Sequence, residues 1–274
     1  MRLPDNHTHR LIDCLTHSRF SFALYRLPWT DECYFILQTS EDVKTLDDIA
    51  ELNGKHGFVI APFQQTEEHP IVLIRPDVTA YDWPEITQSV TSVKYADAIL
   101  TCKPLSTAPI ATLNEEERYE RYFAAFNRFI KPLKAKDFKK LVLSRPTFCP
   151  INEEFSPLET FIKACNAYPR MMIYLCHTPV SGTWLGSTPE ILLSGHAMNW
   201  KTVALAGTMP IENEVEPTEW SPKNQEEQSI VAEYVRKIVK KHGRKMLEKG
   251  PYTARAGQLV HLKTDFLFQL KETG

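Results

Sequence analysis

The sequence predicts an α+β fold in which large mixed or antiparallel sheets pack against helices. Short apolar runs separated by polar turns fill the first hundred residues, and a second series of such runs follows residue 138. Other, longer segments repeat their apolar residues at helical spacing. Strands in consecutive runs, with helices interspersed rather than alternating one for one, are typical of the α+β class.

The strands are predicted from apolar runs bounded by turn residues. In the first hundred residues these runs are ECYFILQT, HGFVIAPF and PIVLIRP. Further along, β-branched and aliphatic residues predict a strand in FKKLVLSRPTFC, residues 138–149. The runs MMIYLCH, GTWLG, EILLSG and KTVALAG then follow one another as successive strands.

Three segments have the periodicity and the caps of helices. The first follows Asn114, repeats its aromatic residues at helical spacing and is expected to end at Pro132. The second begins after Ser156, its expected N-cap. The third and longest begins after Ser221 and closes at Gly243, after a basic last turn. The apolar stripe of this long helix consists of Ile230, Val231, Tyr234, Val235, Ile238 and Val239.

The composition excludes several classes of protein. With 43% hydrophobic residues, 24% charged residues and a net charge of −2, the chain has no excess of basic residues for nucleic acid. No run approaches the roughly 20 apolar residues of a membrane span, and the N-terminus lacks the apolar region of a signal peptide. The six cysteines are scattered without a C-x-x-C pair. We expect a cytoplasmic, disulfide-free monomer.

Two charged residues stand beside apolar runs and are candidates for proton transfer. Glu190 follows the turn Gly-Ser-Thr-Pro and opens the run Ile-Leu-Leu, and a carboxyl group among apolar neighbours can donate a proton at neutral pH. Lys140 would share one face of its strand with Phe138 and Val142, and it needs burial or a nearby cation to act as a base. Spacing by itself favours a solvated side chain at both positions.

The long helix directs one of two adjacent carboxylates toward the core. At about 100° per residue, Glu227 falls roughly 30° from the centre of the apolar stripe, whereas Glu226 falls about 130° away. Glu227 therefore points the way the core residues point, one turn before they start. A metal ligand or a buried ion pair fits this position better than a solvated face.

The run TVALAGTMP ends its strand in small residues. Ala206, Gly207 and Thr208 would let a ligand approach backbone N–H groups, and a threonine hydroxyl can bond a carboxylate. An ordinary glycine turn is the alternative. His261, in QLVHLKTDF, alternates with apolar residues, and this pattern favours a satisfied core or edge histidine over a ligand.

In order along the chain, KLVLSR, WLGSTPEILL, VALAGT, KNQEEQSIVAEYV and QLVHLKT resemble the chorismate-utilising enzymes. Two positions point to the water-adding branch: Lys140 precedes the VLSR-like strand, and Ala206 stands where the aminodeoxychorismate branch carries a lysine. The chain is therefore similar to an isochorismate synthase. The resemblance implies one chorismate-binding-enzyme domain over residues 1–274, with a divergent part, 1–113, and a part resembling the catalytic core, 114–274.

The resemblance also implies a role for each candidate residue. Lys140 would be the general base that activates a water for attack at C2 of chorismate, and Glu190 the general acid that protonates the departing C4 hydroxyl. Glu227 would bind Mg²⁺, which holds the ring carboxylate of the substrate. The expected substrate-binding residues are Ala206, Gly207, Thr208 and His261.

Two departures from the family pattern bear on activity. An arginine is usual after LAGT, where this chain reads MPIENEVEP, and the family continues past HLKT with a segment that carries a second acidic Mg²⁺ ligand. We therefore expect this chain, taken as a truncated form of the fold, to be poorly active. The pathway stays open between menaquinone and siderophore synthesis. The alternatives are a salicylate synthase and a non-catalytic chorismate-binding remnant.

Overall fold

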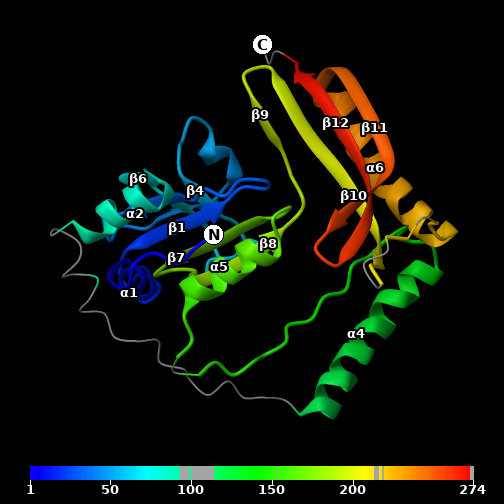
Figure 1. Ribbon diagram of the computed structural model, residues 1–274. Coiled ribbons are helices and arrows are strands. Elements are labelled where there is room, and N and C mark those ends of the chain that lie inside the picture. The colour runs from blue at the N-terminus through cyan, green and yellow to red at the C-terminus, as the bar shows by residue number, and fades with distance from the viewer. Residues whose placement is uncertain (93–98, 100–113, 153, 213–215, 218, 272–274) are drawn as a thin grey trace. The chain divides into compact units, whose positions relative to one another are not determined.

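The structure is a computed structural model that describes residues 1–274 apart from 93–98, 100–113, 153, 213–215, 218 and 272–274. Contacts between Cα atoms divide the chain into two units (Figure 1). Unit 1 consists of Met1–Ser106 and Glu153–Pro189, and unit 2 consists of Thr107–Asn152 and Glu190–Gly274. Each unit is therefore built from two separate stretches of the sequence.

Unit 1 contains two antiparallel sheets. In spatial order, the larger sheet consists of β6 (Val78–Tyr81), β2 (Tyr34–Gln38), β1 (Ser21–Arg26), β7 (Met172–Thr178) and β8 (Gly182–Thr188). The smaller sheet consists of β3 (Lys44–Leu46), β5 (Ile71–Ile74) and β4 (Phe58–Ile60). The apolar runs of the first hundred residues correspond to β2, β4 and β5, so these predicted strands are confirmed, as are MMIYLCH and GTWLG.

The described helices of unit 1 share a core with the larger sheet. They are α1 (Asn6–Leu15), α2 (Asp82–Thr91) and α5 (Pro157–Ala167), and a 3-10 helix, η1 (Ile49–Leu52), lies between β3 and β4. Leu11 of α1, Phe161 of α5 and Ile173 of β7 are fully buried in this core. The helix α5 begins as predicted, because Ser156 Oγ accepts the backbone N–H of Glu159 at 2.9 Å.

Unit 2 contains one antiparallel sheet with a long helix packed on it. In spatial order, its strands are β11 (Gly243–Ala256), β12 (Leu259–Leu270), β10 (Asn199–Pro210) and β9 (Ser194–His196). The helix α6 (Pro222–His242) contributes Ala232 and Val239 to the core of this unit. Every strand pairing that the structure describes is antiparallel, and the helices lie outside the sheets, so the predicted α+β class is confirmed.

The helix predicted after Asn114 is α4 (Glu115–Lys134). Asn114 caps it through a reciprocal pair of hydrogen bonds with Glu117, at 2.9 and 3.0 Å. The prediction that Pro132 ends this helix is wrong by two residues. A proline lacks only its own N–H and disturbs the turn before it, so the residues after it can still complete the last turn.

Two of the predicted strands are also corrected by the structure. Residues 138–149 form no strand, and the run EILLSG contributes only Ser194 and Gly195 to β9. Both runs are β-branched or aliphatic, but Val142 and Leu192 remain exposed. A strand needs a neighbour that takes its backbone hydrogen bonds and covers one face, so residue preference alone does not make one.

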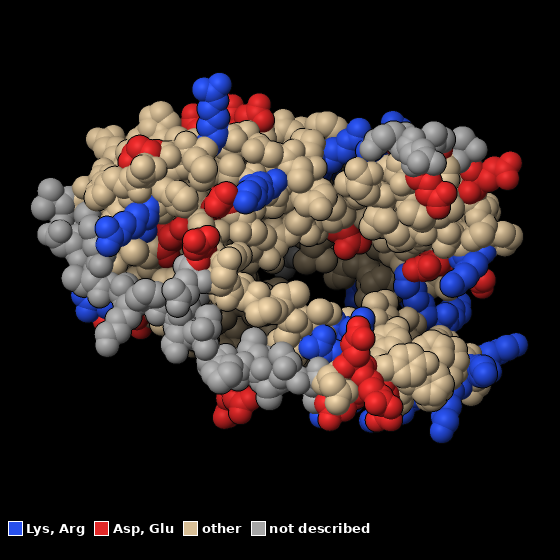
Figure 2. Space-filling view, turned by 60° about the horizontal axis from the view of Figure 1, so that its bottom comes forward, with Lys and Arg blue, Asp and Glu red and all other residues tan. Residues whose placement is uncertain are grey.

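Charged side chains of both signs occur on the surface of the protein. On the face shown in Figure 2, acidic and basic side chains lie interspersed, without an extended area of one sign. Among the described residues, no helix is long and apolar enough to cross a membrane. The described cysteines are free thiols, and Cys102 falls outside the described residues.

Arg26, at the end of β1, is only 1% exposed. Its side chain binds the C-terminal end of α5. Its guanidinium donates to the backbone carbonyls of Cys165, Tyr168 and Pro169, at 3.3, 2.7 and 2.8 Å, and to that of Leu27 at 3.0 Å. The last carbonyls of a helix have no partner within the helix and carry its negative dipole end. Arg26 therefore joins the sheet to α5.

His177, on β7, joins β7 to the turn after α1. Its Nε2 atom donates to the carbonyl of Ser18 at 2.9 Å, and its Nδ1 atom lies 2.8 Å from the hydroxyl of Thr183 on β8. Burial lowers the pKa of His177 below its ordinary value, and it does the same for His17. Burial in the folded protein therefore favours the neutral form of these rings.

We expect the variant Arg26→Met to lose about 3 kcal/mol of unfolding free energy, because it removes the hydrogen bonds that a buried guanidinium donates to the backbone at the end of α5. Urea unfolding of both proteins measures this. Arg19→Met is the control, since Arg19 pairs with Glu41 on the surface and its loss should change stability by less than about 0.5 kcal/mol. Equal stabilities of the two variants would contradict the role of Arg26.

We also expect the free energy of unfolding to fall as the pH is lowered from 7 to 5. Below the ordinary histidine pKa of 6.5, the unfolded chain binds protons at His177 and His17 that the folded protein excludes. His177→Gln should flatten this slope, whereas the exposed His196→Gln should leave it unchanged. Urea unfolding at several pH values gives the slope, and the same slope in both variants would refute the assignment.

Candidate functional site

Lys140 lies in the connection that follows α4, outside any strand. Its Nζ atom donates a hydrogen bond to Oε1 of Glu227 at 2.8 Å. Both side chains are partly buried, with 26% of Lys140 and 37% of Glu227 exposed. Two candidate residues that are 87 positions apart in the sequence thus form one ion pair, which is partly buried. The role of Glu227 as a metal ligand stays a prediction.

The rotation of α6 about its axis determines which carboxylate reaches Lys140. Gln228, next to Glu227, is only 2% exposed, and its amide donates to Ala204 O at 3.0 Å and to Thr264 Oγ1 at 3.1 Å. These bonds hold α6 on β10 and β12. Glu227 consequently lies beside the buried face, on the side of the exposed Tyr234 and Ile238, and not near its centre as predicted. Glu226 is exposed, as expected.

The apolar stripe predicted for α6 is partly wrong. Ala232 and Val239 are buried and Val231 and Val235 pack beside them, whereas Tyr234 and Ile238 are exposed. The helix is rotated because a buried polar side chain, that of Gln228, takes part in the contact with the sheet. Apolar periodicity alone does not detect such a residue.

The small residues at the end of the strand TVALAGT meet His261. His261 Nδ1 lies 3.2 Å from the carbonyl of Gly207 and 3.1 Å from the hydroxyl of Thr208. A carbonyl only accepts, so Nδ1 carries the proton in the bond to Gly207. A break in the register of β10 against β12, between Ala206 and Thr208, produces this arrangement. Gly207, Thr208 and His261 therefore form one polar cluster, and their part in substrate binding stays a prediction.

Gly207 sets the distance between this cluster and α6. Its φ angle is +73°, and a β-carbon at this position would lie 3.0 Å from the backbone carbonyl oxygen of Asn224, in the first turn of α6. Residues with a side chain rarely adopt this backbone angle. The turn that carries Thr208 therefore lies directly against the first turn of α6, and Glu227 follows Asn224 three positions later.

The remaining two candidates, Ala206 and Glu190, also belong to unit 2. Ala206 is buried, and its small side chain faces the interior rather than an open site. Glu190 is exposed, in the connection between β8 and β9, and not at the first position of a strand as predicted. Its proposed part in proton transfer stays a prediction.

A further polar cluster shares the sheet with His261. Asp265 accepts a hydrogen bond from Tyr252 Oη at 2.5 Å, and Lys263 Nζ lies 3.1 Å from its other carboxylate oxygen. Burial and the bond to Asp265 raise the pKa of Tyr252. Residues 261, 263 and 265 alternate along β12, so they share one face of the strand. That alternation was the sequence feature that could have identified Lys263 and Asp265.

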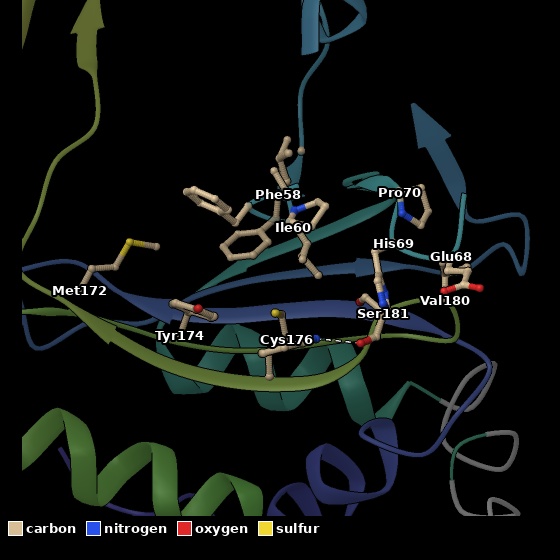
Figure 3. A pocket seen from close by; sticks show the side chains of 16 residues that line it. Phe58, Ile60, Glu68, His69, Pro70, Met172, Tyr174, Cys176, Val180 and Ser181 are labelled. Atoms are coloured by element: carbon tan, nitrogen blue, oxygen red, sulfur yellow. Dashed lines mark hydrogen bonds between the residues drawn. The ribbon is translucent and has the colours of Figure 1, made fainter. Parts of the chain in front are cut away.

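Unit 1 contains a cavity of about 1000 Å³ that none of the predicted site residues line. Figure 3 shows the side chains of Phe58 and Ile60, from β4, facing those of Tyr174 and Cys176, from β7. The rings of Phe58 and Tyr174 lie 6.1 Å apart. Burial raises the pKa of the Cys176 thiol to about 12, so this thiol is not a nucleophile at neutral pH. Most of the lining residues are apolar, and Glu68, His69 and Ser181 are the polar ones among them.

The Mg²⁺ that the family resemblance implies does not fit the residues present. Mg²⁺ is held in proteins by carboxylate and water oxygens in an octahedral shell. Among the described residues, no group of three or more histidine, cysteine, aspartate or glutamate side chains is arranged to hold a metal. The one predicted ligand, Glu227, already holds the ammonium group of Lys140. Binding of Mg²⁺ therefore stays a prediction.

The close approach of Gly207 to α6 leads to a matched pair of substitutions. Gly182 has the same φ angle, +73°, but a β-carbon there would meet nothing within 4 Å. We expect Gly182→Ala to lose about 1 kcal/mol of unfolding free energy from backbone strain alone. Gly207→Ala should lose about 2–3 kcal/mol, because the new methyl group also displaces α6. Urea unfolding compares them, and equal losses would show that the helix contact is unimportant.

The comparisons with known proteins agree with this fold. No curated protein matches the chain. Among solved structures, it is similar to DhbC from Bacillus anthracis, described as a candidate 2,3-dihydroxybenzoate-specific isochorismate synthase, with 17% identity and a TM-score of 0.64 over 98% of this chain and 72% of that one. It is also similar to MenF, the menaquinone-specific isochorismate synthase from Escherichia coli, with 14% identity and a TM-score of 0.58 over 100% of this chain and 69% of that one.

At these identities the two structures establish a shared fold. The sequence model of the family described as chorismate binding enzyme matches residues 42–273, which is most of the chain. The match includes both stretches of unit 2 and the residues of the two polar clusters. This protein therefore belongs to the family of chorismate-binding enzymes.

Proposed function

We propose that this protein is an isochorismate synthase, which converts chorismate to isochorismate. The observation that carries the proposal is the contact between Lys140 and α6, the helix that also lies against the turn of Gly207 and Thr208. The same helix therefore contacts both the proposed base and the strand end proposed to bind the substrate. The names of the two structural neighbours support the same reaction.

In the proposed reaction, one water enters and one leaves. Lys140, as a free amine, takes a proton from a water whose oxygen forms a bond to C2 of the ring. The ring double bonds shift, the C4–O bond breaks, and Glu190 supplies the proton with which the C4 hydroxyl leaves as water. The product is an isomer of the substrate. A base and an acid on opposite sides of one bound ring suit this exchange, because neither has to move between the two steps.

Substrate binding is assigned to the polar cluster at the end of β10. The hydroxyl of Thr208 and the ring of His261 offer hydrogen bonds to a carboxylate, and Ala206 and Gly207 form the strand end that carries Thr208. The predicted Mg²⁺ requirement carries no step of this scheme. Whether the product enters menaquinone or siderophore synthesis depends on the enzymes that follow.

The proposal is tested with the single variant Lys140→Ala. We expect it to reduce isochorismate formation from chorismate at least 100-fold while leaving chorismate binding largely unchanged, because it removes the base and no substrate-binding group. Product chromatography and calorimetry measure the two quantities. Lys139→Ala is the matched control, since Lys139 is the exposed neighbour. Turnover that survives in Lys140→Ala would overturn the assignment of the base.

Three other outcomes would replace the proposed reaction. Fluorescent salicylate in the reaction mixture would show that the protein continues to salicylate with loss of pyruvate. Chorismate binding without any turnover above that of Lys140→Ala would identify a non-catalytic chorismate-binding protein. An absence of binding heat for chorismate, with and without Mg²⁺, would exclude both the enzyme and the binding protein.

A further inference from the structure

The cavity of unit 1 is lined by strands from both of its sheets. Met172, Tyr174 and Cys176 alternate along β7 and line one wall, whereas Ile173 and Leu175, on the other face of β7, pack in the core with the helices. The opposite wall consists of β4 and the residues that follow it. The volume of about 1000 Å³ is at the upper end of the range for small-molecule sites in proteins.

Aromatic rings with fixed positions form much of these walls. The ring of Tyr174 lies over Gly186 of β8, where a β-carbon would overlap it. Phe58 faces this ring from β4, with the two centroids 6.1 Å apart (Figure 3). Trp184 is 55% exposed, although its indole N–H donates to the carbonyl of Ser181 at 2.7 Å. The cavity therefore offers flat apolar surface that is in place before a ligand binds, which lowers the entropy cost of binding.

The charges of the lining residues select the kind of ligand. Among the described residues that line the cavity there is no lysine or arginine, and Glu68 is the one acidic residue. Glu68 lies with His69 and Ser181 at the end of the cavity away from Met172 (Figure 3). A carboxylate such as that of chorismate would be repelled by Glu68 and would find no cationic partner here, whereas an ammonium group would be attracted.

We propose that this cavity binds a planar aromatic molecule that carries an amino group, with its rings against Phe58, Tyr174 and Trp184 and its ammonium group at the Glu68 end. The site is separate from the one proposed for chorismate, because all of its lining residues belong to unit 1. The proposal does not depend on the proposed reaction, and its test contains no chorismate.

The test measures by calorimetry the affinities of three probes that share one ring system and differ in charge: 1-naphthylmethylamine, 1-naphthylmethanol and 1-naphthylacetate. We expect the amine to bind at least about tenfold more tightly than the acetate, with the alcohol between them, because Glu68 attracts the first and repels the last. Equal affinities of the amine and the acetate would overturn the proposal.

The position of the ammonium group is tested with Glu68→Gln. This variant should bind the amine about threefold more weakly and the alcohol as before, a modest effect because water screens an exposed carboxylate. Glu67→Gln is the matched control, since Glu67 is the exposed neighbour and does not line the cavity, and it should leave both affinities unchanged. The same amine affinity in the two variants would refute the role of Glu68.

The location of the rings is tested with Ile60→Trp, which places a larger side chain inside the cavity, where Ile60 faces β7 (Figure 3). It should abolish binding of the amine and of the alcohol alike. Val142→Trp, at an exposed position of unit 2, should not. Urea unfolding shows whether Ile60→Trp is folded, and unchanged affinities in the folded variant would place the site elsewhere. If this variant does not fold, the comparison of Glu68→Gln with Glu67→Gln decides.

Discussion

The packing of α6 on the sheet of unit 2 is the constraint on which its candidate site depends. The helix approaches β10 to backbone distance because position 207 carries no side chain, and a β-carbon there would meet the carbonyl of Asn224 at 3.0 Å. Gln228 then fixes the rotation of the helix through bonds to β10 and β12. The distance of α6 from the sheet and its rotation about its own axis together place Glu227. Its carboxylate accepts a hydrogen bond from Lys140 Nζ.

Several charged side chains of unit 2 form ion pairs with one another. Lys140 is paired with Glu227, Lys263 with Asp265, and Arg236 with Glu248 in a bidentate bond at 2.7 and 2.8 Å. In such pairs the attraction between the two charges offsets part of the cost of removing each from water. A substrate with two carboxylates must therefore exchange some of these protein partners for its own, unless it uses neutral donors such as the hydroxyl of Thr208.

Unit 1 shows how a fold can persist when sequence identity falls to 17%. Two of its joints are buried polar side chains that bind backbone carbonyls. Arg26 binds the carbonyl end of α5, and His177 binds the carbonyl of Ser18. A backbone carbonyl is present whatever residue carries it, so the partners of these two side chains can change identity without loss of the bond. Around them, any apolar residues of suitable volume fill the core.

The sequence by itself determined the elements whose causes are local. Caps at Asn114, Ser156 and Ser221 set the starts of three helices, and apolar runs between turns identified most strands, because these features act within a few residues. The ordered motifs also identified the chorismate-binding family, which the family match confirms. Helical geometry distinguished Glu227 from Glu226 for the same reason: the angle between neighbouring positions on a helix is fixed.

Only the tertiary structure decided what depends on partners distant in the sequence. Residues 138–149 have the composition of a strand but no neighbouring strand, and Glu190 lies in a connection for the same reason. The sequence pattern left Glu227 as either a metal ligand or one half of an ion pair, since both need a carboxylate at the edge of a buried face. Glu227 pairs with Lys140, 87 positions away, because Gly207 and Gln228 fix the position of α6. A local sequence pattern cannot predict a contact between residues so far apart.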